Sequence, residues 1–196
     1  MPRAWTPEEE ARHRAALMDV ARERFAAAGL KGVSVSALTR AAGIGKGSFY
    51  LLFSSKEALF FAVHEAVGEE IEAELVAALE GLTGAALLER YFGFQLERLQ
   101  THPFLRQLTA PGTLETLRAK LPPALIADHE ARDRAFYTGL VRAWIERGAL
   151  PPTLDPELVF ELSAAAFALS LHRDIVGHGF PRVASTLARA LARELA

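Results

Sequence analysis

The sequence predicts an all-α protein of about nine helices, and three observations support this fold class. The composition is 51% hydrophobic and rich in Ala, Leu, Arg and Glu, which favours helices because unbranched side chains lose little rotamer freedom there. Apolar residues recur at helical spacing along most of the chain, and few stretches alternate with period two. Fourteen Gly and ten Pro residues divide the chain into segments of helical length.

Capping residues mark where the first helices begin and end. Thr6, Pro7 and Glu9 predict a helix start at residue 7, and Gly29 predicts its end near residue 28. Two short helices follow, over residues 34–42 and 46–52, joined by a glycine-containing turn. Ser54 and Glu57 predict a capping box that opens a longer helix, which extends to about residue 80. The remaining expected helices cover residues 84–101, 103–121 with a break around 111–112, 123–147, 155–176 and 181–195.

The bulk properties restrict the class of protein. The chain has no Cys, which excludes disulfides and thiolate metal sites. No secretory signal and no apolar run of roughly 18 residues is present, so we expect a cytoplasmic protein. The net charge of −2 is unevenly distributed: residues 1–60 contain nine Lys/Arg and six Asp/Glu, and the remainder carries a net charge of −5. A basic N-terminal part on an acidic remainder is typical of a nucleic-acid-binding head.

Two short helices joined by a glycine-containing turn describe a helix-turn-helix, which places its second helix in the DNA major groove. On that helix Lys46 can reach a phosphate or a guanine edge, Gly47 permits close backbone approach, and the Ser48 hydroxyl can bond a base or a phosphate. We expect Phe49 and Phe53 to pack between the helices. The predicted DNA-binding residues are Ser34, Arg40, Gly45, Lys46, Gly47, Ser48, Tyr50 and Lys56.

The run AAGIGKGSFYLLFSSKEALFFAV resembles the DNA-binding head of the tetracycline-repressor (TetR) family of transcriptional regulators. The resemblance covers about residues 10–63 and implies a DNA-binding domain at 1–54 and a helical ligand-binding and dimerisation domain at 55–196. Four positions depart from the family pattern, and one of them is Thr39, which replaces a common alanine in the first short helix. Gly45 replaces the usual Ser or Thr cap, and Leu51 and Leu52 replace residues that often touch DNA.

The resemblance also implies a homodimer that binds a palindromic operator and a small effector. It places the dimer surface on about residues 133–147 and 157–176, the second of which is rich in small residues. Aromatic and polar residues of the body are either a filled core or the lining of an apolar pocket. The candidate ligand-binding residues are Tyr91, Phe92, Gln95, His102, Phe104, Phe136, Tyr137, Trp144 and Phe167.

Two other classes of function compete with the regulator, a small helical enzyme and a protein-interaction module. The sequence shows no nucleophile–base pair, no Gly-rich nucleotide loop and no metal motif, since His172 and His178 are separated by a glycine. We therefore expect no cofactor, no metal and no enzymatic activity. Both alternatives also leave the run KGSFY unexplained. The sequence predicts a ligand-responsive transcriptional regulator, specifically a repressor that an apolar or amphipathic effector releases from its operator.

Overall fold

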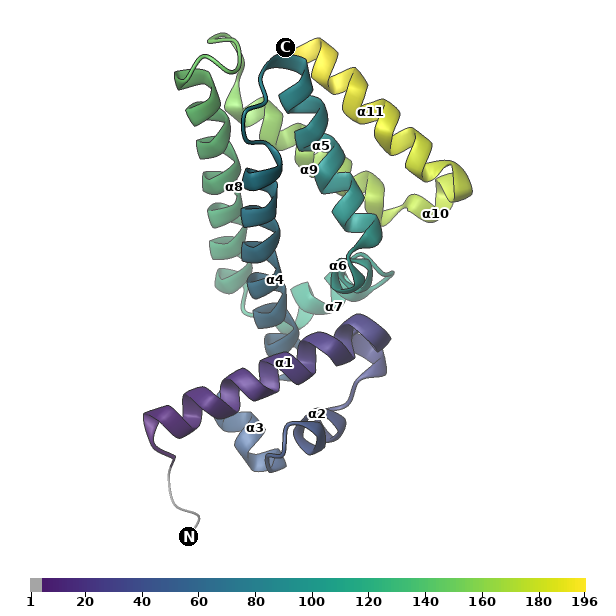
Figure 1. The fold of residues 1–196 in the computed structure, drawn as a ribbon. Coiled ribbons are helices and arrows are strands. Elements are labelled where there is room, and N and C mark those ends of the chain that lie inside the picture. The colour runs from purple at the N-terminus through teal and green to yellow at the C-terminus, as the bar shows by residue number, and fades with distance from the viewer. Residues whose placement is uncertain (1–4) are drawn as a thin grey trace. The chain divides into compact units, whose positions relative to one another are not determined.

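The computed structural model describes residues 5–196, and within them it contains helices and no strands (Figure 1). The all-α prediction is therefore confirmed. None of the helices between residues 5 and 196 is long and apolar enough to span a membrane. The α-helices are α1 (Pro7–Gly32), α2 (Val35–Ala41), α3 (Lys46–Leu52), α4 (Lys56–Ala78), α5 (Gly84–Thr101), α6 (Pro103–Leu108), α7 (Thr113–Lys120), α8 (Pro123–Glu146), α9 (Pro156–Leu171), α10 (Arg173–Val176) and α11 (Phe180–Leu195), with one 3-10 turn at Gly177–Gly179.

Helix breaks explain why the structure contains more helices than the nine expected. Gly112 adopts a positive φ of 78° and separates α6 from α7. His172 has φ −111° and ψ 26°, which ends α9 before the short α10.

Gly29 has φ 68° and ψ 177°, so α1 is kinked there, but the chain resumes a helical course to Gly32. Glycine adopts this conformation without the steric cost that a Cβ would add.

The chain divides into two compact units, and the boundary between them lies inside α4. The head unit contains the described residues up to Glu69 together with His102–Leu121, and the body unit contains Glu70–Thr101 and Pro122–Ala196. Helices α6 and α7 thus belong with α1, α2 and α3. The functional division at residue 54 stays a prediction, because the units describe packing and not activity.

Three phenylalanine side chains pack together in the core of the head unit. Phe60 of α4 lies between Phe25 of α1 and Phe104 of α6, with ring centroids 5.0 and 4.7 Å away. Gln107 of α6 donates a hydrogen bond to the Ala26 carbonyl at 3.4 Å. A Cβ at Gly29 would lie 2.7 Å from Gln107 Oε1, so the absence of a side chain at Gly29 permits this close approach of α6.

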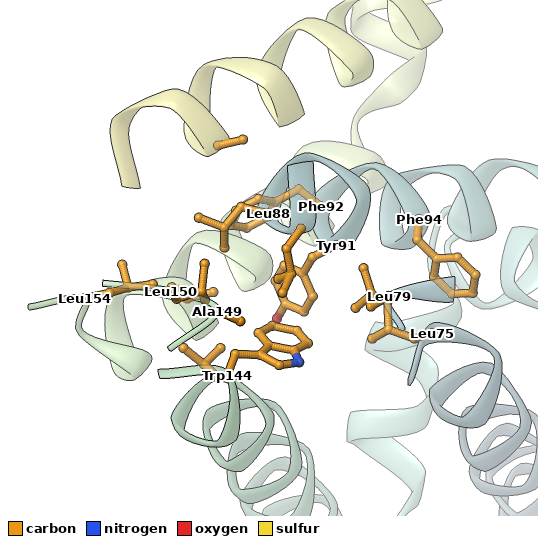
Figure 2. Close-up of a cluster of buried hydrophobic side chains, with 14 of the residues drawn as sticks. Leu75, Leu79, Leu88, Tyr91, Phe92, Phe94, Trp144, Ala149, Leu150 and Leu154 are labelled. Atoms are coloured by element: carbon orange, nitrogen blue, oxygen red, sulfur yellow. The ribbon is translucent and has the colours of Figure 1, made fainter. Parts of the chain in front are cut away.

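The core of the body unit is centred on Tyr91 of α5 (Figure 2). Its ring centroid lies 5.5 Å from that of Trp144 and 6.4 Å from that of Tyr137, both on α8. Helix α11 packs along α5 through Ala184, Ala188 and Ala192, whose small side chains are buried. Their spacing of four residues places them on one face of α11.

Candidate nucleic-acid interface

The turn between α2 and α3 is built as the sequence predicts. Ser34 caps α2 by accepting a hydrogen bond from the Ala37 amide at 3.1 Å. Gly43 has a positive φ of 68°, and the Ile44 amide donates to the Thr39 carbonyl at 3.0 Å. These bonds close the turn and set the direction in which α3 begins. Ser34 and Arg40 are both exposed, so both remain available for the predicted contacts with DNA.

Helix α3 has a buried face and an exposed face. Phe49 is fully buried and Phe53, which follows the helix, is 6% exposed, so their predicted packing role is confirmed. Leu52 is only 7% exposed, because it belongs to the same packed face; it is unavailable for the base contact that its family position suggests. The opposite face presents Lys46, Gly47, Tyr50 and Leu51, and Ser48 is half-buried beside them.

The N-terminus of α3 has no side-chain cap. Gly45 occupies the N-cap position with an extended backbone, and it supplies no side-chain hydrogen bond. The first amides of a helix have no partner within the helix. The absence of a Ser or Thr at this position therefore leaves these amides to water or to an external acceptor.

Arg14 of α1 holds the other end of α3, a role that sequence reasoning missed. Its Nη1 donates to the Leu52 carbonyl at 3.0 Å, and its guanidinium carbon lies 4.2 Å from the Phe53 ring centroid. A cation at a helix C-terminus satisfies a free carbonyl and interacts favourably with the helix dipole. The sequence contains only a weak indication of this role of Arg14. Arg14 lies three residues before Leu17 on α1, and Leu17 is buried.

Lys56 has a structural role that competes with the predicted DNA contact. Its Nζ donates to the Leu30 carbonyl at 2.6 Å and to the Val33 carbonyl at 2.8 Å. These carbonyls belong to the end of α1 and the turn into α2. The ammonium group has three donors, and two of them are therefore engaged within the head unit.

The cap of α4 differs from the prediction. Ser55 accepts the capping hydrogen bond from the Ala58 amide at 3.0 Å, whereas the expected capping box uses Ser54 and Glu57. The two serines are adjacent, and the path of the chain after Phe53 determines which hydroxyl faces the free amides. The start of α4 is displaced by one residue as a result.

The candidate ligand-binding residues are distributed between the two units. His102 and Phe104 belong to the head unit, where His102 caps α6 and Phe104 packs in the core. In the body unit Tyr91, Phe92 and Trp144 are buried in the core, and Gln95, Phe136, Tyr137 and Phe167 are half-buried. A groove of about 690 Å³ between α5 and α11 is lined by none of these residues.

The hydroxyl groups around Tyr91 form a neutral polar cluster. Ser163 of α9 donates to the Tyr91 hydroxyl at 3.0 Å. Burial raises the pKa of Tyr91 above the ordinary value of 10.0. Burial also raises the pKa of Tyr137 well above that value, with smaller contributions from Tyr91, Asp133 and Glu72. Both phenols are therefore protonated at neutral pH and can donate hydrogen bonds.

The fold and the exposed face of α3 define a helix-turn-helix DNA-binding protein. A family profile described as "Bacterial regulatory proteins, tetR family" matches residues 17–63. The chain is 28% identical over 158 residues to the HTH-type transcriptional regulator RutR of Escherichia coli strain K12, covering 76% of this chain and 70% of that protein. These matches support membership of the chain in the tetracycline-repressor family of transcriptional regulators.

Solved structures agree with the fold. A TetR-family regulator from Pectobacterium atrosepticum has a TM-score of 0.71 and 21% identity, covering 97% of this chain and 95% of that one. The fatty acid degradation regulator FadR from Bacillus halodurans has a TM-score of 0.65 and 16% identity, covering 97% of both chains. The family match and the curated relative support a DNA-binding transcriptional regulator.

Proposed function

We propose that the protein is a homodimeric repressor that binds a palindromic operator and is released by a small apolar or amphipathic effector. The exposed face of α3 carries the DNA-binding part of the proposal, because its cation, hydroxyl groups and bare backbone lie opposite a fully packed face. The proposed contacts come from Ser34, Arg40, Gly45, Lys46, Gly47, Ser48 and Tyr50. Lys56 is included as a phosphate contact that its third ammonium donor would make.

A row of small residues on α8 supports the proposed dimer. Its members are exposed and spaced by four residues along the helix: Ala127, Ala131, Ala135, Gly139 and Ala143. On α9 Ala164, Ala165 and Ala168 are exposed, while Ala166 and Ser170 are buried within the body unit. Helices α8 and α9 pack together. Small residues on two adjacent helices permit close approach of the same pair from a second chain, and a twofold dimer would present two α3 helices to two half-sites.

The neutral hydroxyl cluster supports an uncharged or amphipathic effector. Tyr91, Tyr137 and Ser163 place protonated hydroxyl groups among aromatic side chains. Small-molecule sites commonly combine an apolar lining with a few polar groups that fix orientation. We propose that the effector enters this part of the body unit and bonds to these hydroxyls. The other proposed lining residues in the body unit are Phe92, Gln95, Phe136, Trp144 and Phe167.

Helix α4 is the proposed coupling element, since it contributes residues to both units. The effector must bind the DNA-incompetent arrangement more tightly than the DNA-competent one; otherwise it shifts no population. We propose that the DNA-binding function resides in residues 1–54 and the effector and dimerisation functions in residues 55–196. A repressor of this kind acts on chromosomal DNA, so the proposed location is the cytoplasm.

The test begins with selection of binding duplexes by the full-length protein from a random DNA pool. We expect enrichment of a sequence with two inverted half-sites whose centres lie about one helical turn, or a multiple of it, apart. Lys46→Ala and Tyr50→Phe should each weaken binding, and Lys46→Ala should reduce the slope of log K against log salt by about one. Selection of no sequence, or unchanged binding by both variants at several salt concentrations, would refute the proposed DNA-binding surface.

The effector part needs a separate measurement. Compounds that raise the unfolding temperature of the free protein are added at saturating concentration to the protein–operator complex. The proposal expects that at least one neutral apolar compound weakens operator binding and changes the emission of Trp144, which is 4% exposed in the body core. Equal operator affinity with and without every stabilising compound would contradict release by an effector.

A further inference from the structure

Leu51 is unusual among the apolar residues of the head unit because its side chain is 75% exposed. It lies on α3 one turn after Gly47, so the two residues share a face of the helix. Long side chains in a helix lean toward the N-terminus. The isobutyl group of Leu51 therefore leans toward the turn that contains Gly47, but it does not come within 4 Å of a Cβ built there.

Gly47 leaves open space on this face. A Cβ built on Gly47 would have no neighbour within 4 Å. The bare backbone and the exposed Leu51 side chain together make a shallow apolar surface on α3, which we call the Leu51 notch. Lys46 and Tyr50 lie beside it, and their polar groups can bond to the DNA backbone while the notch faces the bases.

The chemistry of the notch restricts what it can recognise. Leu51 offers neither a donor nor an acceptor, so it cannot distinguish bases through hydrogen bonds. In the major groove the apolar group that distinguishes one base from the others is the C5-methyl group of thymine. We propose that Leu51, together with the bare backbone at Gly47, recognises the C5-methyl group of one thymine in each operator half-site. This inference depends on the proposed binding of α3 in the major groove.

The size of the effect follows from the burial of one methyl group. Loss of that methyl should weaken binding roughly fourfold for one half-site, and on the order of tenfold when both half-sites of a dimer are changed. Only a protein that has the Leu51 side chain should lose affinity when the thymine methyl group is removed. Leu51→Ala itself should leave the fold unchanged, because the side chain is mostly exposed and alanine is a better helix former.

The test uses the selected operator duplex with deoxyuridine in place of thymidine, changed at one symmetric pair of positions at a time. The full-length parent should lose about tenfold in affinity at one pair of positions. Leu51→Ala should bind the parent operator with a similar loss, and deoxyuridine at that pair should weaken it no further. Val183→Ala, which trims another exposed apolar side chain on α11, should behave like the parent at every position.

A complementary probe restores the methyl group on a different base. An operator with cytosine at the critical position should bind the parent weakly, and 5-methylcytosine there should recover part of the loss. Parent binding that is insensitive to deoxyuridine everywhere, or equal sensitivity of the parent and Leu51→Ala, would overturn the inference and leave the proposed function intact. If the parent binds no duplex of the selected pool, the proposed function fails and this inference fails with it.

Discussion

Replacing Lys56 with methionine tests whether this cation stabilises the head unit or contacts DNA. Methionine keeps an apolar stem of similar length and removes the ammonium group. The Nζ atom donates to the Leu30 and Val33 carbonyls at 2.6 and 2.8 Å. Each hydrogen bond of a charged group is worth about 1.5 kcal/mol or more. Water can partly solvate the freed carbonyls, because Lys56 is only half-buried. We therefore expect the head unit to lose about 2 kcal/mol of stability.

Lys46→Met is the matched control, because Lys46 is exposed at the start of α3. This substitution should leave the stability of the head unit unchanged within about 0.5 kcal/mol. It should reduce the slope of log K against log salt by about one, since it removes a phosphate or base contact. The two substitutions therefore differ in their expected effect on stability, which Lys56→Met should lower and Lys46→Met should leave unchanged.

The assay combines native-state hydrogen exchange with operator titrations at several salt concentrations. Peptides from the end of α1 and from α2 should exchange faster in Lys56→Met and at the parent rate in Lys46→Met. Operator titrations are made well below the unfolding temperature, so that both variants are folded. Lys56→Met could instead retain its exchange protection and reduce the slope of log K against log salt by about one. That result would contradict the structural role of Lys56 and support its contact with DNA.

Four further predictions test other parts of the structure. Gly47→Ala should raise the helical stability of α3 by about 1 kcal/mol, because the added Cβ meets nothing within 4 Å, yet it should weaken operator binding; urea unfolding and gel shifts measure the two effects. Arg14→Ala should lower the stability of the head unit by about 1–2 kcal/mol through loss of its carbonyl bond and its aromatic contact, with an unchanged salt slope once the protein is folded. Ala135→Arg should give a folded monomer by light scattering, because it places a charge in the row of small residues on α8; a dimer of unchanged strength would exclude this face. Burial raises the pKa of Tyr91 and Tyr137 in the folded state, so their contribution to stability is present below the ordinary value of 10.0 and is lost as the pH rises above it. The tyrosinate absorbance of two of the three tyrosines should therefore appear together with the loss of helical circular dichroism, and ionisation of all three before unfolding would contradict this burial.

Most helix boundaries were predictable because they depend on neighbouring residues. Ser34 as a cap, the turn at Gly43 and the extent of α3 follow from local capping and glycine geometry. The end of α1 was less predictable. Gly29 was expected to end the helix, but it marks a kink and the chain continues a helical course to Gly32. The close approach of Gln107 to Gly29 involves a helix far along the chain.

The residues around the effector were the least predictable part of the site. The sequence predicts nine aromatic and polar residues as candidates for ligand binding, but it does not indicate which of them are in contact with one another. The structure places Phe104 in the head unit beside Phe60 and puts Tyr91 in the body unit beside Trp144 and Ser163. These contacts join residues separated by 40 or more positions, and neither periodicity nor capping carries information on such pairs.

The sequence by itself determined that α3 has an exposed face and a packed face. Helical periodicity places Lys46, Gly47 and Tyr50 opposite Phe49, and this division needs no knowledge of the partner helices. Only the tertiary structure decided what each cation does. Lys46, Lys56 and Arg14 are all basic residues on helices of the head unit, but the carbonyls of Leu30, Val33 and Leu52 engage Lys56 and Arg14. The physical reason is that a basic side chain is drawn to whichever free carbonyls the fold brings within reach, and here these lie 23 to 38 residues away along the chain.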